Sequence, residues 1–347
     1  MRGGWWGVAA AAWLLRPVRP RVWQPVPVTG SLKARARHAV MAMVSAGLLG
    51  GLLVACSSED SDEPASLPAL RVAVGPEGES QLLARTVVVL LEDAGISAET
   101  VVLADGRSVR QAIEFGDVEL AIAYSGEEWL TRLGRADPPG DPAAGFEVLA
   151  EADRARGLTW LVPTFGSGVE EPPVNATFAF FVAGPPSVDA DLRTLSELAL
   201  RLSERPELSL CVDTEFGRRP DGLAALLSAY SVRRDRPFLA ADPSDAVLGV
   251  LAGDCIAGLS HATDGLAWRS GLKPLVDDLR FFPAFVPAPL VRSAVLVETP
   301  GLEEALRPLV EGLSTGMLGR ANGAVRGGAN VDAVALDLAA RLAPDPR

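Results

Sequence analysis

Short apolar runs alternate with helix-forming segments along most of the chain. Leu70–Gly75 is an apolar run typical of a buried strand, and residues 80–93 follow as a helix whose end suits Gly95. Residues 101–103 predict a second strand and residues 118–124 a third. Strand, helix and strand at this spacing predict parallel βαβ units, so the expected fold class is α/β.

Several predicted helices begin with a sequence that is typical of an N-cap. Ser108 and Gln111 have capping-box spacing, in a helix that should stop at Gly116. Ser125 and Glu128 have the same spacing directly after the third strand. Asp221 and Asp264 each precede a glycine and are typical of N-caps.

One pattern occurs twice in the chain. In the first copy, Gly116 is followed by a strand that ends at Tyr124, where a helix starts. In the second, Gly253 is followed by a strand that ends at His261, where a helix starts. The offset is 137 residues from 116 to 253 and from 124 to 261. A chance match is the alternative. If the repeat is real, two α/β lobes each place one side chain at the C-terminal end of a strand, where open α/β sheets bind ligands. Two such edges would form a cleft between lobes.

Composition narrows the function classes. The chain has 347 residues, 48% of them hydrophobic, which is enough for about two domains. Its net charge of −12 argues against a nucleic-acid binder. Two histidines and three cysteines are few for a metal or thiol site, so we expect no metal and no cofactor.

The charge is unevenly spread. Residues 1–55 hold seven of the 32 basic residues and none of the 44 acidic ones, so the remainder has a net charge of −19. A basic cluster at 33–38 precedes an uncharged apolar run that ends in Leu53-Val54-Ala55-Cys56. This is typical of an export signal, and its ending is similar to a bacterial lipobox, in which Cys56 would be acylated. A transmembrane anchor is the alternative. Residues 56–68 predict a solvated tether.

Five short segments resemble those of the substrate-binding lipoproteins of ABC importers for glycine betaine, choline and related osmoprotectants. They occur in the family's order: Ala121–Gly126 (similar to EYTG), Asn175–Phe178 (NNTY), Arg219–Gly222 (RPDG), Thr263–Gly265 (STDG) and Phe281–Phe285 (FFPPY). The resemblance implies a two-lobed, type II periplasmic-binding-protein fold that closes over its ligand. The lobes would comprise residues 69–178 with 286–347, and residues 179–285.

The resemblance also implies a ligand site. The family holds a trimethylammonium head in a box of aromatic rings, usually tyrosines. Matched position by position, the box falls on Tyr124, Phe178, His261 and Phe285. Three further positions match pocket residues: Gln81 a polar one, Arg219 an arginine that can meet a carboxylate, and Glu127 a threonine.

Each of these residues also has a simpler interpretation. Phe178 and Phe285 stand in or beside apolar runs and could be core, while Tyr124 and His261 could be packed residues with satisfied polar atoms. Glu127 suits the first turn of a helix without any ligand. Arg219 could pair with an acidic residue. Protonated, His261 would repel a cation, which Glu127 could offset.

Cys211 and Cys255 remain once Cys56 is acylated. They lie at the ends of two predicted strands of the second lobe, in an oxidising compartment, which makes a disulfide one hypothesis. Two buried small hydrophobic residues are the alternative.

Three function classes compete. The first is a lipid-anchored receptor that delivers a quaternary-amine or zwitterionic osmolyte to an ABC permease. The second is an extracytoplasmic sensor or binding protein of the same fold for another small solute. An enzyme is disfavoured because the chain has no Gly-x-Ser-x-Gly, His-Glu-x-x-His or P-loop pattern.

Overall fold

The computed structural model describes residues 68–343 apart from residues 76–77, 104–107, 136–137, 166–172, 186, 188 and 234–237. The export signal at 1–55, Cys56 and almost all of the tether lie outside the described residues. Among the described helices, none has both the length and the apolar character that crossing a bilayer requires.

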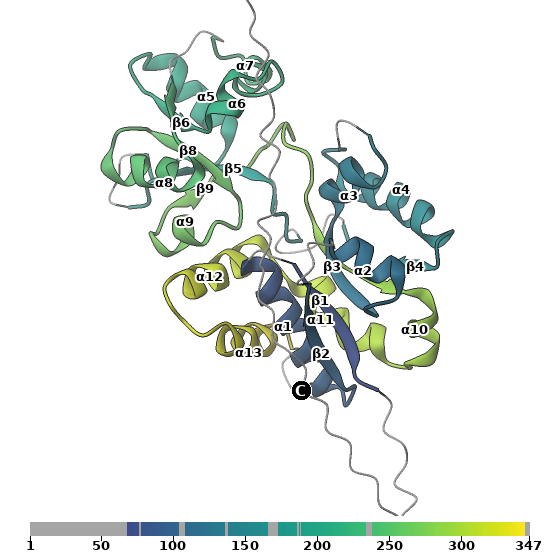
Figure 1. The fold of residues 1–347 in the computed structure, drawn as a ribbon. Coiled ribbons are helices and arrows are strands. Elements are labelled where there is room, and N and C mark those ends of the chain that lie inside the picture. Colours follow the sequence, from purple (N-terminus) through teal and green to yellow (C-terminus); the bar gives the residue numbers. More distant parts are fainter. Residues whose placement is uncertain are drawn as a thin grey trace, which may run out of the picture. The chain divides into compact units, whose positions relative to one another are not determined.

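The first lobe is built on a five-stranded sheet in the order β2-β1-β3-β10-β4. β1 pairs in parallel with β2 and β3, and β10 pairs antiparallel with β3 and β4. The strands are β1 (Leu70–Val74), β2 (Ala98–Val102), β3 (Leu120–Tyr124), β4 (Leu158–Trp160) and β10 (Pro287–Arg292). Chain segments from both sides of the second lobe therefore complete one sheet, as Figure 1 shows.

Helices cover this sheet and supply most of its core. They are α1 (Gly78–Asp93), α2 (Val109–Phe115), α3 (Ser125–Thr131), α4 (Pro142–Arg154), α10 (Ser293–Glu298), α11 (Leu302–Gly312), α12 (Thr315–Arg326) and α13 (Val331–Leu342). α1 packs against α11 and α13 (Figure 1). Leu83, Val87 and Leu91 of α1 are buried in that core.

The second lobe repeats the arrangement with a sheet in the order β7-β6-β8-β5-β9. β6 is parallel to β7 and β8, whereas β5 is antiparallel to β8 and β9. Its strands are β5 (Phe178–Val182), β6 (Leu210–Val212), β7 (Phe238–Ala240), β8 (Ala257–His261) and β9 (Lys273–Pro274). Its helices are α5 (Leu195–Glu204), α6 (Thr214–Arg218), α7 (Leu223–Ala229), α8 (Pro243–Ala252) and α9 (Gly265–Arg269).

The predicted repeat is confirmed. β3 and β8 occupy the same place in their sheets and end on Tyr124 and His261. The helix before each strand ends on a glycine in the left-handed region, Gly116 at φ 78° and Gly253 at φ 81°. Only glycine adopts this conformation without strain, which explains why the glycine recurs at the same offset.

Most of the predicted helix and strand ends agree with the structure, with one clear exception in the first lobe. The Ser108 capping box is present and Gly95 has a φ of 77°, while β2 covers 98–102 rather than 101–103. The predicted capping box at Ser125 is wrong, because α3 begins at Ser125 itself. The Ser125 hydroxyl instead accepts from the Val286 amide at 3.0 Å, and Glu128 is buried beside Arg110.

The two predicted aspartate caps differ in outcome. Asp264 caps α9 by accepting from the amides of Leu266 and Ala267. Asp221 does not cap α7, because Gly222 occupies that position and the Asp221 carboxylate pairs with Arg219 at 3.0 Å.

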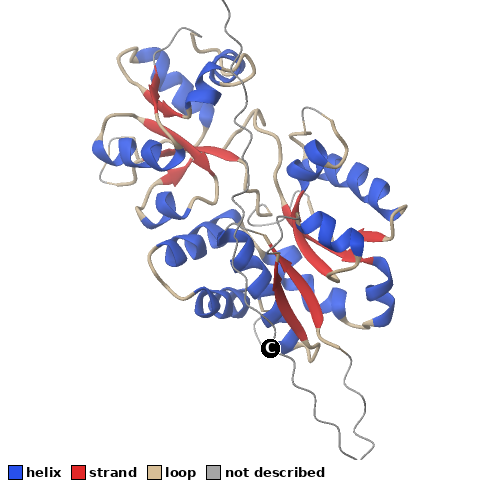
Figure 2. Ribbon diagram, viewed as in Figure 1, coloured by secondary structure: helices blue, strands red, loops and turns tan. Residues whose placement is uncertain are grey.

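Two crossover segments join the lobes, residues 173–177 and residues 283–286, and both are irregular in Figure 2. They lie side by side: the Ala176 amide donates to the Phe285 carbonyl at 2.9 Å, and the Thr177 hydroxyl donates to the Pro283 carbonyl at 2.6 Å. The Asn175 side-chain oxygen accepts from the Phe285 amide at 2.8 Å. These bonds fix where the lobes meet.

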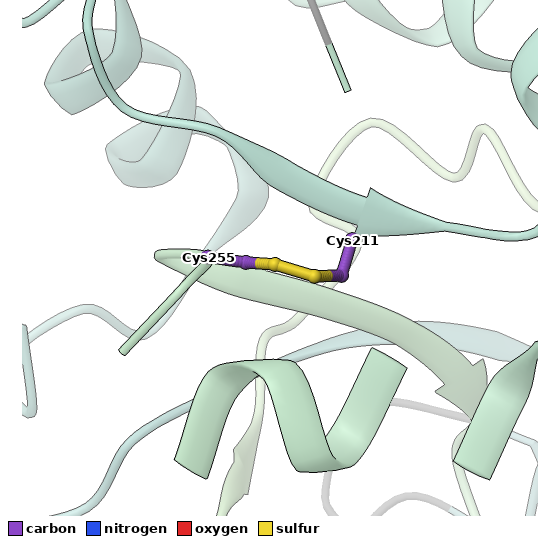
Figure 3. The surroundings of a disulfide bond; sticks show 2 residues. All are labelled: Cys211 and Cys255. Atoms are coloured by element: carbon purple, nitrogen blue, oxygen red, sulfur yellow. A yellow bond between two sulfur atoms is a disulfide. The ribbon is translucent and has the colours of Figure 1, made fainter. Parts of the chain in front are cut away.

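A disulfide joins Cys211 in β6 to Cys255 just before β8 (Figure 3). The two Cα atoms are 5.7 Å apart and the bond closes a loop across 44 positions of sequence. Both residues are buried beside Gly249 of α8, so the bond ties neighbouring strands inside the second lobe.

The disulfide can be counted chemically in a chain that begins after Cys56. Denatured without reductant, this chain should show no free thiol, and two after reduction. The double variant Cys211→Ser/Cys255→Ser should lose about 2–4 kcal/mol of unfolding free energy, because the unfolded chain regains loop entropy. Reductant should not destabilise that variant further. Two free thiols in the unreduced wild type would contradict the bond.

Candidate functional site

A cavity of about 620 Å³ lies where the two lobes and α12 meet. Its lining comes from the turn after β1, the ends of β3 and β8, both crossover segments and α12. The lining residues are Gly75, Gly78, Glu79, Ser80, Val109, Ile122, Tyr124, Glu127, Ala176, His261, Thr263, Asp264, Gly265, Phe285, Asn322, Val325 and Arg326. The repeated strand ends thus contribute to one cavity, as expected for sheets that bind ligands at this edge.

Tyr124 enters the cavity at the end of β3, where the chain turns into α3. The ring is half-buried, and its hydroxyl donates a hydrogen bond to the Glu79 Oε1 atom at 2.6 Å. A bond to a carboxylate is stronger than one between neutral groups, so it holds the ring in one orientation.

Phe285 is positioned by the crossover pairing and by a glycine. Its backbone is held by Asn175 and Ala176. Its ring lies over Gly126, where an added Cβ would come within 2.5 Å of the ring atoms. A side chain at position 126 would therefore displace the ring from the cavity wall.

His261 ends β8 and is exposed at the cavity. Phe178 is its cross-strand partner, and the two rings stack with centroids 5.0 Å apart and planes 19° from parallel. Phe178 itself does not line the cavity. Phe178 is 36% exposed, and its ring also approaches Phe216 and Phe282 of the second lobe. It therefore packs between these rings and His261.

Glu79 is a cavity carboxylate with a hydrogen-bond donor on each oxygen. It lies in the first turn of α1, where the helix dipole favours an anion. Its Oε1 atom accepts from Tyr124, and its Oε2 atom accepts from the Asn322 side-chain amide at 2.6 Å. The same amide nitrogen donates to the Thr263 carbonyl at 3.0 Å.

The lining contains more acids than bases. Glu79, Glu127 and Asp264 face one guanidinium, that of Arg326, which donates to the Ser244 hydroxyl at 3.1 Å. The Asp264 carboxylate is already engaged by two backbone amides and the Ser260 hydroxyl. The three carboxylates together give the cavity a negative field, which favours a cationic ligand.

Residues 68–340 match the family described as the substrate binding domain of an ABC-type glycine betaine transport system. The chain belongs to this family. It is thus the substrate-binding component of a transport system and not an enzyme, and such components act outside the cytoplasm.

Named relatives agree with this assignment. The glycine-betaine-binding protein of Pseudomonas aeruginosa is 25% identical over 273 residues, which cover 77% of this chain and 85% of the relative. The glycine betaine-binding protein YehZ of Escherichia coli is 27% identical over 287 residues, covering 80% and 91%.

Solved structures agree on the fold. Apo YehZ from Escherichia coli matches with a TM-score of 0.69 and 26% identity, over 78% of this chain and 97% of that one. A structure described as a glycine betaine/carnitine/choline ABC transporter matches with a TM-score of 0.67 and 21% identity, over 77% and 96%. The two-lobed, type II periplasmic-binding-protein fold is therefore shown.

Within this substrate-binding domain, three expected site residues lie outside the cavity lining: Phe178, Gln81 and Arg219. Gln81 lies on the exposed face of α1, two residues beyond Glu79. Arg219 is half-exposed and pairs with Asp221 at 3.0 Å and with Glu215 at 3.8 Å. Both partners are its near neighbours in sequence.

Sequence reasoning missed Glu79 and Asn322 as cavity residues. Glu79 belongs to the turn after β1, and a strand-to-helix turn at the ligand edge of a sheet could have drawn attention to it. Asn322 is one polar residue in a C-terminal helix with no motif around it. Its role depends on α12 reaching both lobes, which local patterns do not reveal.

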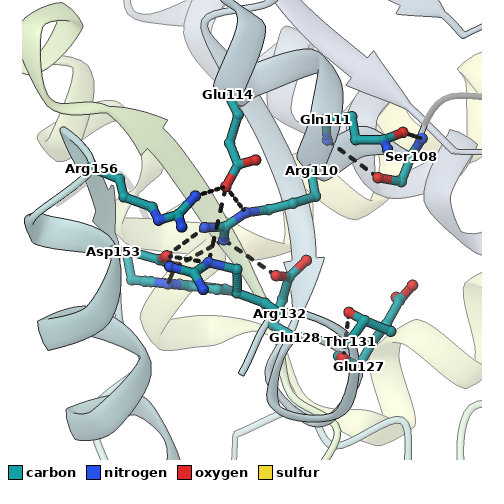
Figure 4. A network of polar contacts seen from close by, with 11 residues as sticks. Ser108, Arg110, Gln111, Glu114, Glu127, Glu128, Thr131, Arg132, Asp153 and Arg156 are labelled. Atoms are coloured by element: carbon teal, nitrogen blue, oxygen red, sulfur yellow. Dashed lines mark hydrogen bonds and ion pairs between the residues drawn. The ribbon is translucent and has the colours of Figure 1, made fainter. Parts of the chain in front are cut away.

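A buried charge cluster joins α2, α3 and α4 (Figure 4). The Arg110 guanidinium donates to Glu128 at 3.2 Å and to Asp153 at 2.9 Å, and Glu114 accepts from the same side chain. Burial raises the pKa of Glu128 to about 7, although the charge of Arg110 opposes the shift. Burial lowers the pKa of Arg110, but the bonds to its acidic partners outweigh this and hold it above its usual range.

Glu128 should make stability depend on pH. The pKa of Glu128 in the folded protein lies above its ordinary value of 4.5, so the folded state binds more protons than the unfolded state between the two pKa values. Stability therefore falls as pH rises from about 4.5 to about 7. Relative to Glu128→Gln, the unfolding free energy of the wild type should fall on the order of 3 kcal/mol across this range. Chemical denaturation at each pH measures the difference.

The matched control is Glu147→Gln, which removes an exposed carboxylate of α4 that lies outside this charge cluster. Its pH profile should run parallel to that of the wild type. If Glu128→Gln also ran parallel to the wild type, the elevated pKa would be contradicted.

Proposed function

We propose that this chain is a lipid-anchored receptor that binds a small quaternary ammonium osmoprotectant and delivers it to an ABC permease. The observation that carries the proposal is the cavity in which the rings of Tyr124 and Phe285 and the carboxylate of Glu79 come together. The names of the relatives, glycine-betaine-binding and carnitine transport binding proteins, support the ligand class.

The chemistry of the ligand explains this combination. A quaternary ammonium cannot donate a hydrogen bond, so its charge must be met by ring faces or by carboxylates. Each ring face contributes about 0.5–2 kcal/mol, whereas micromolar binding requires about 8 kcal/mol. Rings alone therefore do not suffice, and we assign the remainder to Glu79, Glu127 and burial of the methyl groups.

The aromatic box proposed from the resemblance takes a modified form. Tyr124, His261 and Phe285 would form the walls, and Phe178 would support His261 by stacking on it. For a solute that also carries a carboxylate, Arg326 is the lining residue that could meet it, whereas Arg219 would stay with its acidic neighbours.

The anchor would be a diacylglycerol-type lipid on Cys56. The lipobox-like sequence Leu53–Cys56 after a basic cluster supports this, as does the acidic, serine-rich tether that follows it. The lobes would then close about the two paired crossover segments, bringing their cavity walls onto the solute.

Calorimetric titration of a chain beginning after Cys56 tests the ligand class. Glycine betaine, choline, carnitine, proline betaine and ectoine form the panel, and at least one quaternary ammonium should bind with micromolar or tighter affinity. Absence of heat with every solute would remove the osmoprotectant function and leave the sensor or binding protein for another solute.

Replacing one ring tests the cavity wall. Phe285→Ala should weaken binding of the quaternary ammonium at least fivefold, because a ring face that meets the cation is lost. Phe281→Ala is the matched control: it removes a ring from the same stretch of chain that does not line the cavity, so its dissociation constant should equal that of the wild type. Equal affinities for both variants would show that Phe285 is core.

A further inference from the structure

The side-chain amide of Asn322 touches both lobes at the cavity wall. Its nitrogen lies 2.6 Å from the Glu79 Oε2 atom of α1 and 3.0 Å from the Thr263 carbonyl, which belongs to the turn between β8 and α9. One group therefore joins the ligand edge of the first sheet to that of the second.

The backbone under this amide has little freedom to move. A Cβ at Gly265 would come within 2.6 Å of the Asn322 carbonyl group, and a Cβ at Gly323 would lie 3.0 Å from the Gly265 carbonyl oxygen. Gly319 gives room to the Trp268 ring in the same way. α12 thus packs on α9 at backbone distance, while it also contacts α1 and α13.

The contacts form a continuous chain of hydrogen bonds. The Tyr124 hydroxyl donates to Glu79, Asn322 donates to Glu79 from the other side, and Asn322 also donates to the Thr263 carbonyl. Its two ends lie at the strand ends that the internal repeat relates, Tyr124 at β3 and the turn that follows His261 at β8.

We propose that Asn322 is a positioning residue for ligand binding, which acts by holding the Glu79 carboxylate toward the cavity and by tying it to the turn after β8. This inference rests on the proposed function, in which the Glu79 carboxylate is the charge that meets the ammonium head of the ligand. A carboxylate with donors on both oxygens has one orientation, and its field acts on the cavity without reorganisation when the cation arrives. Without Asn322, one oxygen loses its donor and the turn loses its link to the first lobe.

A double-mutant cycle separates positioning from a merely structural role. Choline and glycine betaine are titrated into the wild type, Asn322→Ala, Glu79→Ala and the double variant. Asn322→Ala should weaken binding of the better ligand about tenfold in the wild-type background. In the Glu79→Ala background the same substitution should weaken it less than twofold, because the group that Asn322 positions is already gone.

Asn330→Ala is the matched control. Asn330 caps α13 by accepting from the amides of Asp332 and Ala333, and it does not line the cavity. This variant should lower the melting temperature and leave the dissociation constants unchanged. It shows whether loss of an asparagine contact in the C-terminal helices weakens binding by destabilisation alone.

The outcomes are distinct. Equal weakening by Asn322→Ala in both backgrounds, or no weakening in either, would overturn the positioning role.

If neither solute binds the wild type, the proposed function fails for these ligands. The same four proteins then decide the inference by denaturant unfolding: additive losses of unfolding free energy would overturn the coupling of Asn322 to Glu79, and non-additive losses would support it.

Discussion

The pairing of the two crossover segments is the contact on which the site depends. Asn175 and Ala176 bind the backbone of Phe285 on one segment, and Ser125 binds the next residue, Val286. Together these bonds place the Phe285 ring beside the end of β3 and hold the two crossover segments together between the lobes. A segment without regular structure can hold a ring in this way because its backbone groups are paired by the facing segment and by Ser125.

The cavity also follows from sheet topology. β3 and β8 have the same position in sheets of the same strand order, so Tyr124 and His261 are equivalent residues of two similar lobes. The side chains differ, however, in their surroundings. Tyr124 is tied to a carboxylate of α1, whereas His261 stacks on a ring of the antiparallel neighbour β5. Equivalent backbone positions therefore present an oriented phenol from one lobe and an exposed imidazole from the other.

Local sequence patterns predicted the strands and helices better than they predicted the residues of the ligand cavity. The offset of 137 residues between two glycine-terminated helices and the strands after them identified both strand ends, because a left-handed cap and an apolar strand each leave a local signature. Nothing local links Glu79 to Asn322, which lie 243 positions apart and meet only through helix packing. Arg219 matched a family motif, but the acidic residues beside it on the same turn decide where its charge is satisfied.

The strand order has a consequence for how the chain can assemble. β10 lies between β3 and β4 in the first sheet, yet it is made only after the whole second lobe has been made. Contacts of long sequence separation form slowly because the intervening loop must first be closed. The second lobe is one continuous stretch between the crossover segments, residues 178–282, and has a disulfide of its own. The first sheet therefore stays open between β3 and β4 until β10 is available to pair with both strands.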